Sequence, residues 1–267
     1  MEKRIRFEKY VAAGNDFVVV DDRGGSVKNG AAAAKKLCGP FGVGADGLLL
    51  LRRSKKADVQ MRIFNPDGSE ADMCGNGVRC LAHFAAGLGA AKTKMSVETG
   101  AGLIHADVRG DVVKAKLTEP KDFRSGVDVR INGRTERVQF VNTGVPHAVI
   151  VEPGLKKADV SARGRAVRHH RHFAPHGTNV NFVRVGAKQI EVRTYERGVE
   201  GETLACGTGS TASALVAARM KGLRSPVSVK TASGEILKVY FKEKNGNFEE
   251  VYLEGAVRKV FEGSVNV

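Results

Sequence analysis

Two of the four cysteines stand in the same short pattern, Cys-Gly-x-Gly, which begins at Cys74 and again at Cys206. Each pattern comes directly before a segment rich in Ala and Leu that predicts a helix. The first turn of a helix has backbone N–H groups without partners and a partial positive charge, so it lowers the pKa of a cysteine there and binds anions. The glycines let a ligand approach the backbone. The pattern therefore predicts two reactive thiols, each beside an anion-binding turn.

Two such thiols suit the inversion of a carbon that bears a weakly acidic C–H. A base must remove the proton from one face while an acid delivers a proton to the other, and a thiolate with a thiol supplies both. The neighbouring amides would hold the substrate carboxylate and stabilise the charge that develops on it. We interpret Cys74 and Cys206 as this acid–base pair, and the chemistry requires no metal and no cofactor. Cys38 and Cys80 are interpreted as small apolar core residues.

The segments that must position the thiols are two apolar helices among many short strands. Residues 77–86 and 209–220 carry small or apolar side chains on nearly every face, which predicts helices buried inside sheet-lined domains. Runs rich in β-branched residues predict the strands, of which the clearest are 17–20, 138–141, 148–151, 179–185 and 238–241. Two buried helices indicate two cores.

The sequence also repeats itself once. The offset between the two cysteine motifs is 206 − 74 = 132, and nearby offsets of 131 and 130 align segments further upstream. The aligned segments are 74–77 with 206–209, 96–99 with 228–231, 62–65 with 193–196, and Gly14 with Gly144. We interpret this as a duplicated αβ unit, in which the two cysteine turns would face each other and form one site. The alternative is chance similarity between two helices of small residues.

Composition permits a globular enzyme and raises one other class. The 267 residues are 42% hydrophobic and 27% charged, and no apolar run is long enough for a membrane span or a signal peptide, so we expect a soluble cytoplasmic protein. The net charge of +14 makes a nucleic-acid binder the alternative, with residues 52–56 and 163–172 as its basic footprint. Without Trp and with 6% aromatic residues, a solvated basic surface is favoured. The hypothesis that the histidines of residues 163–172 bind a metal is weaker than the hypothesis of nucleic-acid binding.

Six motifs extend the pattern over nearly the whole chain. They are GNDF at 14–17, GVGADG at 42–47, FNPDGSEADMCGNGVRC at 64–80, GVPH at 144–147, GTNVNF at 177–182 and YERGVEGETLACGTG at 195–209. With these motifs the sequence resembles the diaminopimelate epimerase family. Against many members, the segment between Glu196 and Cys206 is one residue longer, through Val199 and Glu200, Val145 replaces an Asn, and Gly47 replaces a polar residue.

The resemblance implies a cofactor-independent isomerase that interconverts LL- and meso-2,6-diaminopimelate on the route to lysine and cell-wall precursor, and a homodimer. It implies catalytic roles for Cys74 and Cys206. The amides that would hold the reacting carboxylate belong to Gly75, Asn76, Gly207 and Thr208. The side chains that would hold the distal end of the substrate are Asn15, Asn65, Asn179, Glu196 and Arg197. His147 would lie near Glu196, in contact with substrate or behind it.

The rival within enzymes is a proline or hydroxyproline racemase, which shares the two-thiol design. Asn76 and the Glu196–Arg197 pair favour a longer substrate with two zwitterionic ends. Without the motifs, the alternative interpretation is that Asn65 forms a turn and has no other role, and that Glu196 and Arg197 are a solvated surface pair. The fold expected is α+β, with two similar, pseudo-symmetric domains that each wrap a sheet around a central helix. Their predicted bounds are 1–119 with 258–267, and 120–257, with the boundary at Glu119–Pro120.

Overall fold

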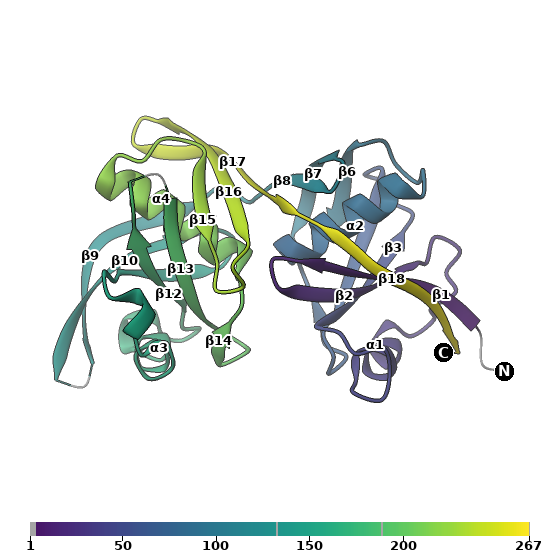
Figure 1. Cartoon of the computed structure of the whole chain (residues 1–267), viewed down its shortest axis with the longest axis horizontal. Coiled ribbons are helices and arrows are strands. Elements are labelled where there is room, and N and C mark those ends of the chain that lie inside the picture. The colour runs from purple at the N-terminus through teal and green to yellow at the C-terminus, as the bar shows by residue number, and fades with distance from the viewer. Residues whose placement is uncertain (1–3, 132, 188, 267) are drawn as a thin grey trace. The chain divides into compact units, whose positions relative to one another are not determined.

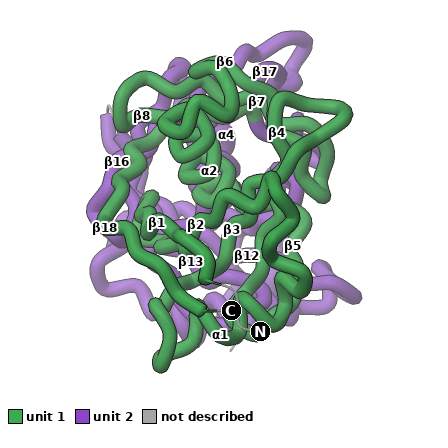
Figure 2. Tube along the Cα trace, turned by 90° about the vertical axis from the view of Figure 1, so that its right-hand side faces the viewer, with its two compact units in different colours: residues 1–116, 255–267 green, residues 117–254 purple. Residues whose placement is uncertain are grey.

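The computed structural model describes residues 4–131, 133–187 and 189–266. It divides into two compact units, Met1–Lys116 with Gly255–Val267 (unit 1) and Leu117–Glu254 (unit 2), which are coloured separately in Figure 2. The sequence placed the boundary at Glu119–Pro120, three residues further along the chain. Unit 1 takes back the end of the chain as a strand, so its two parts are far apart in the sequence.

Unit 1 is a sheet that curves around one helix. Its elements are β1 (Arg4–Ala12), β2 (Asn15–Asp21), α1 (Gly30–Cys38), β3 (Gly47–Arg52), β4 (Val59–Phe64), β5 (Glu70–Ala71), α2 (Gly75–Gly87), β6 (Lys94–Thr99), β7 (Gly102–Arg109), β8 (Val112–Lys116) and β18 (Arg258–Asn266). Strand β1 pairs antiparallel with β18 and β2, and β2 pairs parallel with β3. The helix α2 contacts β1 to β4 and β6 to β8, and Figure 1 shows it enclosed by these strands.

Unit 2 is built in the same way around a second helix. Its elements are β9 (Lys121–Ile131), β10 (Arg134–Asn142), β11 (Pro146–Val151), the 3₁₀ turn η1 (Leu155–Lys157), α3 (Val160–Arg168), the 3₁₀ turn η2 (Arg171–Phe173), β12 (Asn179–Val185), β13 (Gln189–Glu196), β14 (Gly201–Thr203), α4 (Gly207–Lys221), β15 (Val227–Lys230), β16 (Ile236–Lys244) and β17 (Asn247–Ala256). The helix α4 contacts β10 to β13, β15 and β16 (Figure 1). All five predicted strand segments lie inside observed strands.

The strand registers confirm the duplication. In unit 1, β4 pairs parallel with β6, with Val59 opposite Val97. In unit 2, β13 pairs parallel with β15, with Ile190 opposite Val229. The offsets of these pairs, 190 − 59 = 131 and 229 − 97 = 132, are those found in the sequence. Chance similarity of two helices would not reproduce the register of strands that lie outside them.

Both predicted buried helices are present, and each begins two residues earlier than predicted, directly after its cysteine. In α4 every residue from Gly207 to Ala218 except Thr208 is buried. The buried polar side chains of this helix therefore need hydrogen-bond partners within the protein. Thr211 and Ser213 donate their hydroxyls to the carbonyls one turn earlier, Gly207 and Gly209, at 2.9 and 2.7 Å. The helix ends at Gly222, whose φ of 67° and N–H bond to Ala218 form a glycine C-cap.

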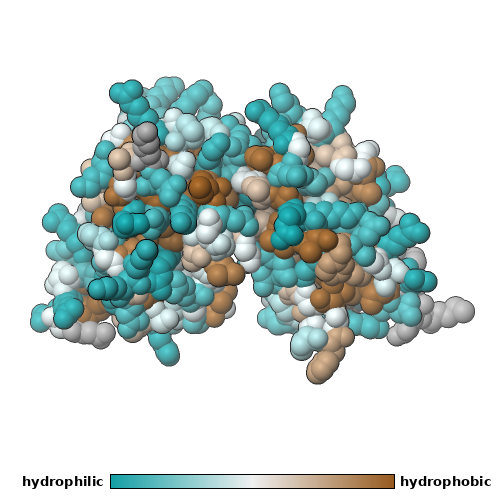
Figure 3. Space-filling model, viewed as in Figure 1, coloured by the Kyte–Doolittle hydropathy of each residue, from teal (hydrophilic) through white to brown (hydrophobic). Residues whose placement is uncertain are grey.

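Two further helices, α1 and α3, pack on the outer faces of the sheets and were not predicted. Asn29 caps α1 by accepting from the Ala32 N–H at 3.0 Å, and Asp159 caps α3 by accepting from Ala162 at 2.9 Å. Figure 3 shows hydrophilic side chains over much of the visible face of each unit, interspersed with apolar patches. Of the helices that the structure describes, none has the length and apolar character needed to cross a membrane.

Candidate active site

Cys74 is the N-cap of α2. Its backbone is extended, with φ −139° and ψ 123°, while its carbonyl accepts the first helical bond from Val78 at 2.8 Å. The Sγ atom accepts from the Gly77 N–H at 3.5 Å, and the thiol side chain is only half-buried. Gly75 and Asn76 follow in the first helical turn, where backbone N–H groups lie beyond the reach of helical carbonyls. The Cys74 thiol therefore lies beside the first-turn amides that were predicted to bind an anion.

The side chain of Asn76 belongs to a chain of hydrogen bonds that includes a second predicted site residue. Asn76 Nδ2 donates to Asn15 Oδ1 at 2.7 Å, and Asn15 Nδ2 donates to Asp46 Oδ2 at 3.0 Å. On the other side, Arg79 Nη2 donates to Asn76 Oδ1 at 2.6 Å. Neither Arg79 nor Asp46 was predicted as a site residue from the sequence. The signal for Arg79 was a cation in the middle of an otherwise apolar helix.

Asn65 lies on an exposed turn between β4 and β5. Its carbonyl accepts from the Gly68 N–H at 2.9 Å, and its Nδ2 donates to Ser69 Oγ at 2.9 Å. Gly68 has a φ of +86°, a conformation that favours glycine. The turn that the sequence offered as the alternative role for Asn65 is therefore formed, and its side chain is exposed at the end of β4.

Cys206 occupies the equivalent place in unit 2. It is the N-cap of α4, with φ −127° and ψ 116°, and its carbonyl accepts from the Ser210 N–H at 2.8 Å. Its Sγ lies 3.4 Å from the hydroxyl of Thr208. The Thr208 carbonyl accepts from Thr143 Oγ1 at 3.1 Å, which ties the first turn of α4 to the end of β10. Thr143 was not predicted.

Asn181 connects α4 to His147 beneath this turn. A Cβ atom added to Gly209 would lie 2.3 Å from Asn181 Oδ1, so only glycine allows the helix to approach Asn181 this closely. Asn181 Oδ1 accepts from Thr194 Oγ1 at 3.0 Å, and Nδ2 lies 3.1 Å from His147 Nδ1. The alternation in Asn179-Val180-Asn181 could have identified Asn181, since both Asn side chains then lie on one face of β12.

His147 is fully buried and neutral. Burial, with a smaller contribution from the charge of Arg197, lowers the pKa of His147 from its ordinary 6.5 to about 3. Asn181 Nδ2 can only donate, so His147 Nδ1 accepts and the ring proton lies on Nε2. Among the described residues, none accepts a hydrogen bond from that buried Nε2. The structure therefore places His147 beside Asn181 and within the electrostatic influence of Arg197.

Arg197 and Glu196 lie where β13 ends. The Arg197 backbone N–H donates to Asn179 Oδ1 at 2.8 Å, and its Nη1 donates to the His176 carbonyl at 3.3 Å. Glu196 Oε2 accepts from Thr203 Oγ1 at 2.9 Å. These contacts bring three predicted residues, Asn179, Glu196 and Arg197, together at one end of the β12–β13 pair. Each is held by neighbours and is not simply solvated.

Glu200, in the segment that the motifs predicted to be one residue longer than in many family members, lies in a tight turn. Its φ is +56°, and its N–H bonds to the Glu196 carbonyl at 2.9 Å. Its carboxylate pairs with Arg168 of α3 at 3.0 Å. Glu200 is thus held in its turn by a contact with α3.

The remaining cysteines are core residues, as predicted. Cys38 and Cys80 are 6% and 0% exposed, and burial raises the pKa of the Cys38 thiol to about 11. A thiol with a raised pKa is protonated at neutral pH and is a poor base. Cys38 therefore lacks the environment that the chemistry requires.

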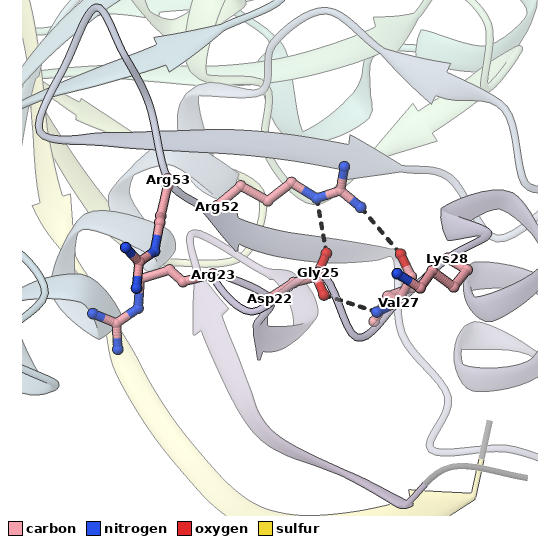
Figure 4. Close-up of a pocket in the computed structure, with 7 residues that line it drawn as sticks. All are labelled: Asp22, Arg23, Gly25, Val27, Lys28, Arg52 and Arg53. Atoms are coloured by element: carbon pink, nitrogen blue, oxygen red, sulfur yellow. Dashed lines mark hydrogen bonds and ion pairs between the residues drawn. The ribbon is translucent and has the colours of Figure 1, made fainter.

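A pocket of about 370 Å³ in unit 1 holds part of the first basic stretch. Its lining residues are Asp22, Arg23, Gly25, Val27, Lys28, Arg52 and Arg53, as Figure 4 shows. Of these described residues, none is a predicted site residue. Arg52 is paired with the buried Asp22 at 2.8 Å, and Arg23 is paired with Asp21 at 2.7 Å. The pocket is therefore distinct from the thiol chemistry and already contains internal counter-ions.

The second basic stretch is also braced by carboxylates. Arg163 pairs with Glu136 at 2.9 Å and with Glu152 at 2.6 Å. Within the described ranges of the chain, His, Cys, Asp and Glu form no cluster that could hold a metal ion. These contacts favour a solvated, ion-paired surface over a nucleic-acid footprint.

Comparison with known proteins agrees with the motifs. A family profile described as diaminopimelate epimerase matches residues 7–121 and 139–260. A diaminopimelate epimerase of Aquifex aeolicus is 45% identical, and the alignment covers 98% of this chain and 98% of that protein. One from Archaeoglobus fulgidus is 41% identical, with coverage of 97% and 96%.

Solved structures share the fold at low identity. A phenazine biosynthesis protein of the PhzF family from Bacillus anthracis has a TM-score of 0.78 at 18% identity and covers 99% of this chain and 100% of its own. A hydroxyproline epimerase from Agrobacterium vitis, solved with trans-4-hydroxy-L-proline, has a TM-score of 0.75 at 16% identity, covering 99% and 92%. At these identities the likeness establishes the two-fold repetition of a sheet around a helix, and no substrate.

Proposed function

The chain belongs to the diaminopimelate epimerase family, and from that premise we propose that it interconverts LL- and meso-2,6-diaminopimelate with Cys74 and Cys206 as its two acid–base groups. The observation that carries the assignment of these residues is that each is the N-cap of the buried helix of its unit, at equivalent positions of a duplicated topology. One reaction that needs two opposed bases then draws one from each unit.

In the proposed reaction one cysteine, as thiolate, removes the α-proton, while the other, as thiol, delivers a proton to the opposite face of the same carbon. The amides of Gly75, Asn76, Gly207 and Thr208 hold the reacting carboxylate. They stabilise the charge that moves onto it as the proton leaves. The proton balance is closed, because the reaction transfers one proton in and one out and exchanges the roles of the thiols. No bound cofactor enters these steps.

We propose that the distal end of the substrate is held by Asn15, Asn65, Asn179, Glu196 and Arg197. Arg197 can grip a carboxylate with two parallel N–H bonds, and Glu196 can accept from an ammonium group. The support is that Asn179 fixes the Arg197 backbone while the His176 carbonyl fixes its guanidinium. His147 supports this cluster from within the core as a neutral group.

The biological setting is also a proposal. The chemistry of the substrate belongs to lysine and peptidoglycan-precursor synthesis, which is cytoplasmic. We propose a homodimer, as the family resemblance implies, and Val260 and Phe261 of β18 are large apolar side chains that are 43% and 47% exposed and could contact a second copy. Light scattering coupled to size exclusion would measure the mass in solution.

The alternatives are weaker on specific grounds. A proline or hydroxyproline racemase needs no recognition of a distal zwitterion, whereas Arg197, Glu196 and Asn179 form a braced polar cluster. A nucleic-acid binder needs basic side chains available to phosphates, whereas Arg52, Arg163 and Arg168 are ion-paired.

The test is to measure epimerisation of LL-diaminopimelate by the Cys74→Ala and Cys206→Ala variants. Each should lose at least about a thousandfold in kcat, since a base is removed and the cap position tolerates a small residue. Cys38→Ala and Cys80→Ala are the matched controls and should keep most of the activity. Near-normal turnover by either of the first two variants would refute the assignment.

A further inference from the structure

Arg79 is a fully buried cation on α2, at 0% exposure. Taking a guanidinium out of water is costly unless its N–H groups find acceptors with good geometry. The acceptors of Arg79 include the Gly75 carbonyl, to which Nε donates at 3.3 Å, the Ala256 carbonyl, to which Nη1 donates at 3.3 Å, and Asn76 Oδ1, to which Nη2 donates at 2.6 Å. Two of these acceptors belong to the anion-binding turn that follows Cys74.

The contact with Asn76 determines which way two amide side chains point. A guanidinium has donors and no acceptor, so Asn76 must turn its Oδ1 toward Arg79 and its Nδ2 away. That Nδ2 then donates to Asn15 Oδ1 at 2.7 Å, so Asn15 must turn its own Nδ2 outward, where it donates to Asp46 Oδ2 at 3.0 Å. A carboxylate only accepts, so the chain runs from a donor-only group to an acceptor-only group. Neither amide can flip without breaking two bonds.

The equivalent position in unit 2 shows that this arrangement is not required to build the helix. The offset of 132 places Thr211 opposite Arg79, and Thr211 donates to the Gly207 carbonyl at 2.9 Å just as Arg79 donates to that of Gly75. Within the part of the chain that the structure describes, the Thr211 hydroxyl makes no hydrogen bond beyond that carbonyl. The residue that matches Asn76 is Thr208, whose hydroxyl lies 3.4 Å from Cys206 Sγ. The longer reach of Arg79 is therefore specific to the turn in unit 1.

Arg79 also ties this turn to the returning end of the chain. Ala256 is the last residue of β17 and, with Gly255, begins the segment that belongs to unit 1 and continues as β18. Through Nη1 the guanidinium connects that strand end with Asn76. One buried side chain thus fixes the position of the turn and the orientation of its amide.

We propose that Arg79 is a positioning residue: it fixes the Asn76 side chain beside the first turn of α2 and, through it, presets the donor and acceptor atoms that Asn15 presents to the substrate. The role rests on the proposed function, in which the Asn76 backbone amide and the Asn15 side chain contact diaminopimelate. Each amide has two N–H groups and two lone pairs, so the chain of hydrogen bonds leaves capacity for a ligand on both residues. Arg79 touches no substrate in this account and acts through Asn76.

The test compares the parent with Arg79→Lys, which keeps the charge but cannot reach three acceptors, and with Asn76→Ala and the double variant. Val78→Ala is the matched control, since Val78 is also 0% exposed on α2 and outside the hydrogen-bond chain. We expect Arg79→Lys to lower kcat/KM about tenfold or more, the loss that follows from one misplaced charge-assisted bond. In a protein that already carries Asn76→Ala, adding Arg79→Lys should lower kcat/KM little further. Val78→Ala should lower the melting temperature and leave kcat/KM unchanged.

If the losses in kcat/KM of Arg79→Lys and Asn76→Ala multiply in the double variant, the two residues act independently and the proposal is overturned. A loss in kcat/KM of Val78→Ala equal to that of Arg79→Lys would also overturn it, by showing a merely structural role. A second readout does not depend on activity: water exchange of the Asn76 side-chain amide measured by NMR. It should be slow in the parent and in Val78→Ala, and fast in Arg79→Lys, with the exposed Asn247 as internal reference. Exchange in the parent as fast as that of Asn247 would refute the fixed orientation without any variant. A parent that fails to epimerise diaminopimelate would refute the proposed function and leave this readout to decide the role of Arg79.

Discussion

Arg197 is positioned at both ends, through its backbone by Asn179 and through its guanidinium by the His176 carbonyl. A side chain prepared in this way loses less conformational entropy when it binds a carboxylate. The same residue contributes to the low pKa of the buried His147. At the scale of single residues, therefore, Asn179, Arg197 and His147 depend on one another, through a hydrogen bond in one case and through charge in the other.

Arg197→Lys should lower kcat/KM for diaminopimelate by about tenfold to a hundredfold, because lysine cannot form two parallel bonds to a carboxylate although it keeps the charge. Lysine as substrate lacks the second carboxylate and serves as the control. It should be very poor for the parent and lose little more in the variant. Equal losses for the two substrates would show that Arg197 has a structural role only.

His147 should make the protein sensitive to acid. Its folded pKa of about 3 lies below the ordinary 6.5, so between these values the unfolded chain binds a proton that the folded chain does not. The contribution of His147 to the free energy of unfolding is thus fully present above about pH 6.5. It falls as the pH decreases below that value, by at most about 1.4 kcal/mol per pH unit. His147→Gln should reduce the difference between urea midpoints at about pH 7 and about pH 5. The exposed His105→Gln is the control and should keep the parent's difference.

The structural positions of the candidate site residues were predictable from the sequence where a motif carried them, and not where they depend on hydrogen bonds between distant segments. Cys74 and Cys206 follow from the local pattern, since an N-cap position is set by the helix that begins there. Asn181 and Asp46 contact residues 28 and 31 positions away, Gly209 and Asn15, which no local pattern reveals. Arg79 was visible as an anomaly in an apolar helix, but its partners were not.

At the scale of elements, the two central helices and the two outer helices differ in how strongly the sequence specifies them. Helices α2 and α4 are apolar on almost all faces, so their burial follows directly from composition. Helix α3 carries Arg163, Arg165 and Arg168, and its basic character resembles a solvated loop. It forms because Asp159 caps it and because Gly164 packs closely on Tyr195, contacts that only the tertiary structure supplies.

Two glycine substitutions test the packing of the central helices. Gly209→Ala should destabilise the protein by about 1–3 kcal/mol, because the new Cβ would lie 2.3 Å from Asn181 Oδ1. Gly87→Ala is the matched control in α2, where nothing lies within 4 Å of the added atom, and it should stabilise by up to about 1 kcal/mol. Urea denaturation measures both. A Gly209→Ala variant as stable as the parent would show that the close approach to Asn181 is absent.

At the scale of the whole molecule, unit 1 depends on the last strand of the chain. Strand β18 pairs with β1 from Arg4 opposite Asn266 to Val11 opposite Arg258, and Val265 packs against the core that includes Ile5 and Phe7. The repeat in the sequence predicted two similar units, and the registers confirm them. The exact ends could not be predicted, because the strand that crosses between units is continuous in pattern with those on either side.

Removal of residues 258–267 should destabilise unit 1 selectively, because β1 loses one of its two antiparallel partners and the core loses Val265. Limited proteolysis of the truncated chain should cut within residues 4–116 and spare residues 121–187. Glu262→Gln, which removes only a surface pair with Lys259, is the control and should resist proteolysis like the parent. Equal protection of unit 1 in the truncated and full chains would contradict the role assigned to β18.

The central claim is that two thiols act on opposite faces of one carbon, and deuterium incorporation during the first turnovers tests it most directly. Thiol protons exchange with solvent, so LL-diaminopimelate incubated with the enzyme in deuterated water should give meso product that carries deuterium at the inverted carbon. The unreacted LL substrate, recovered early, should still carry protium there, because the base that removes its proton does not return one to the same face. Deuterium in recovered substrate as early as in product, or product that retains the original proton, would indicate a single base and contradict the account.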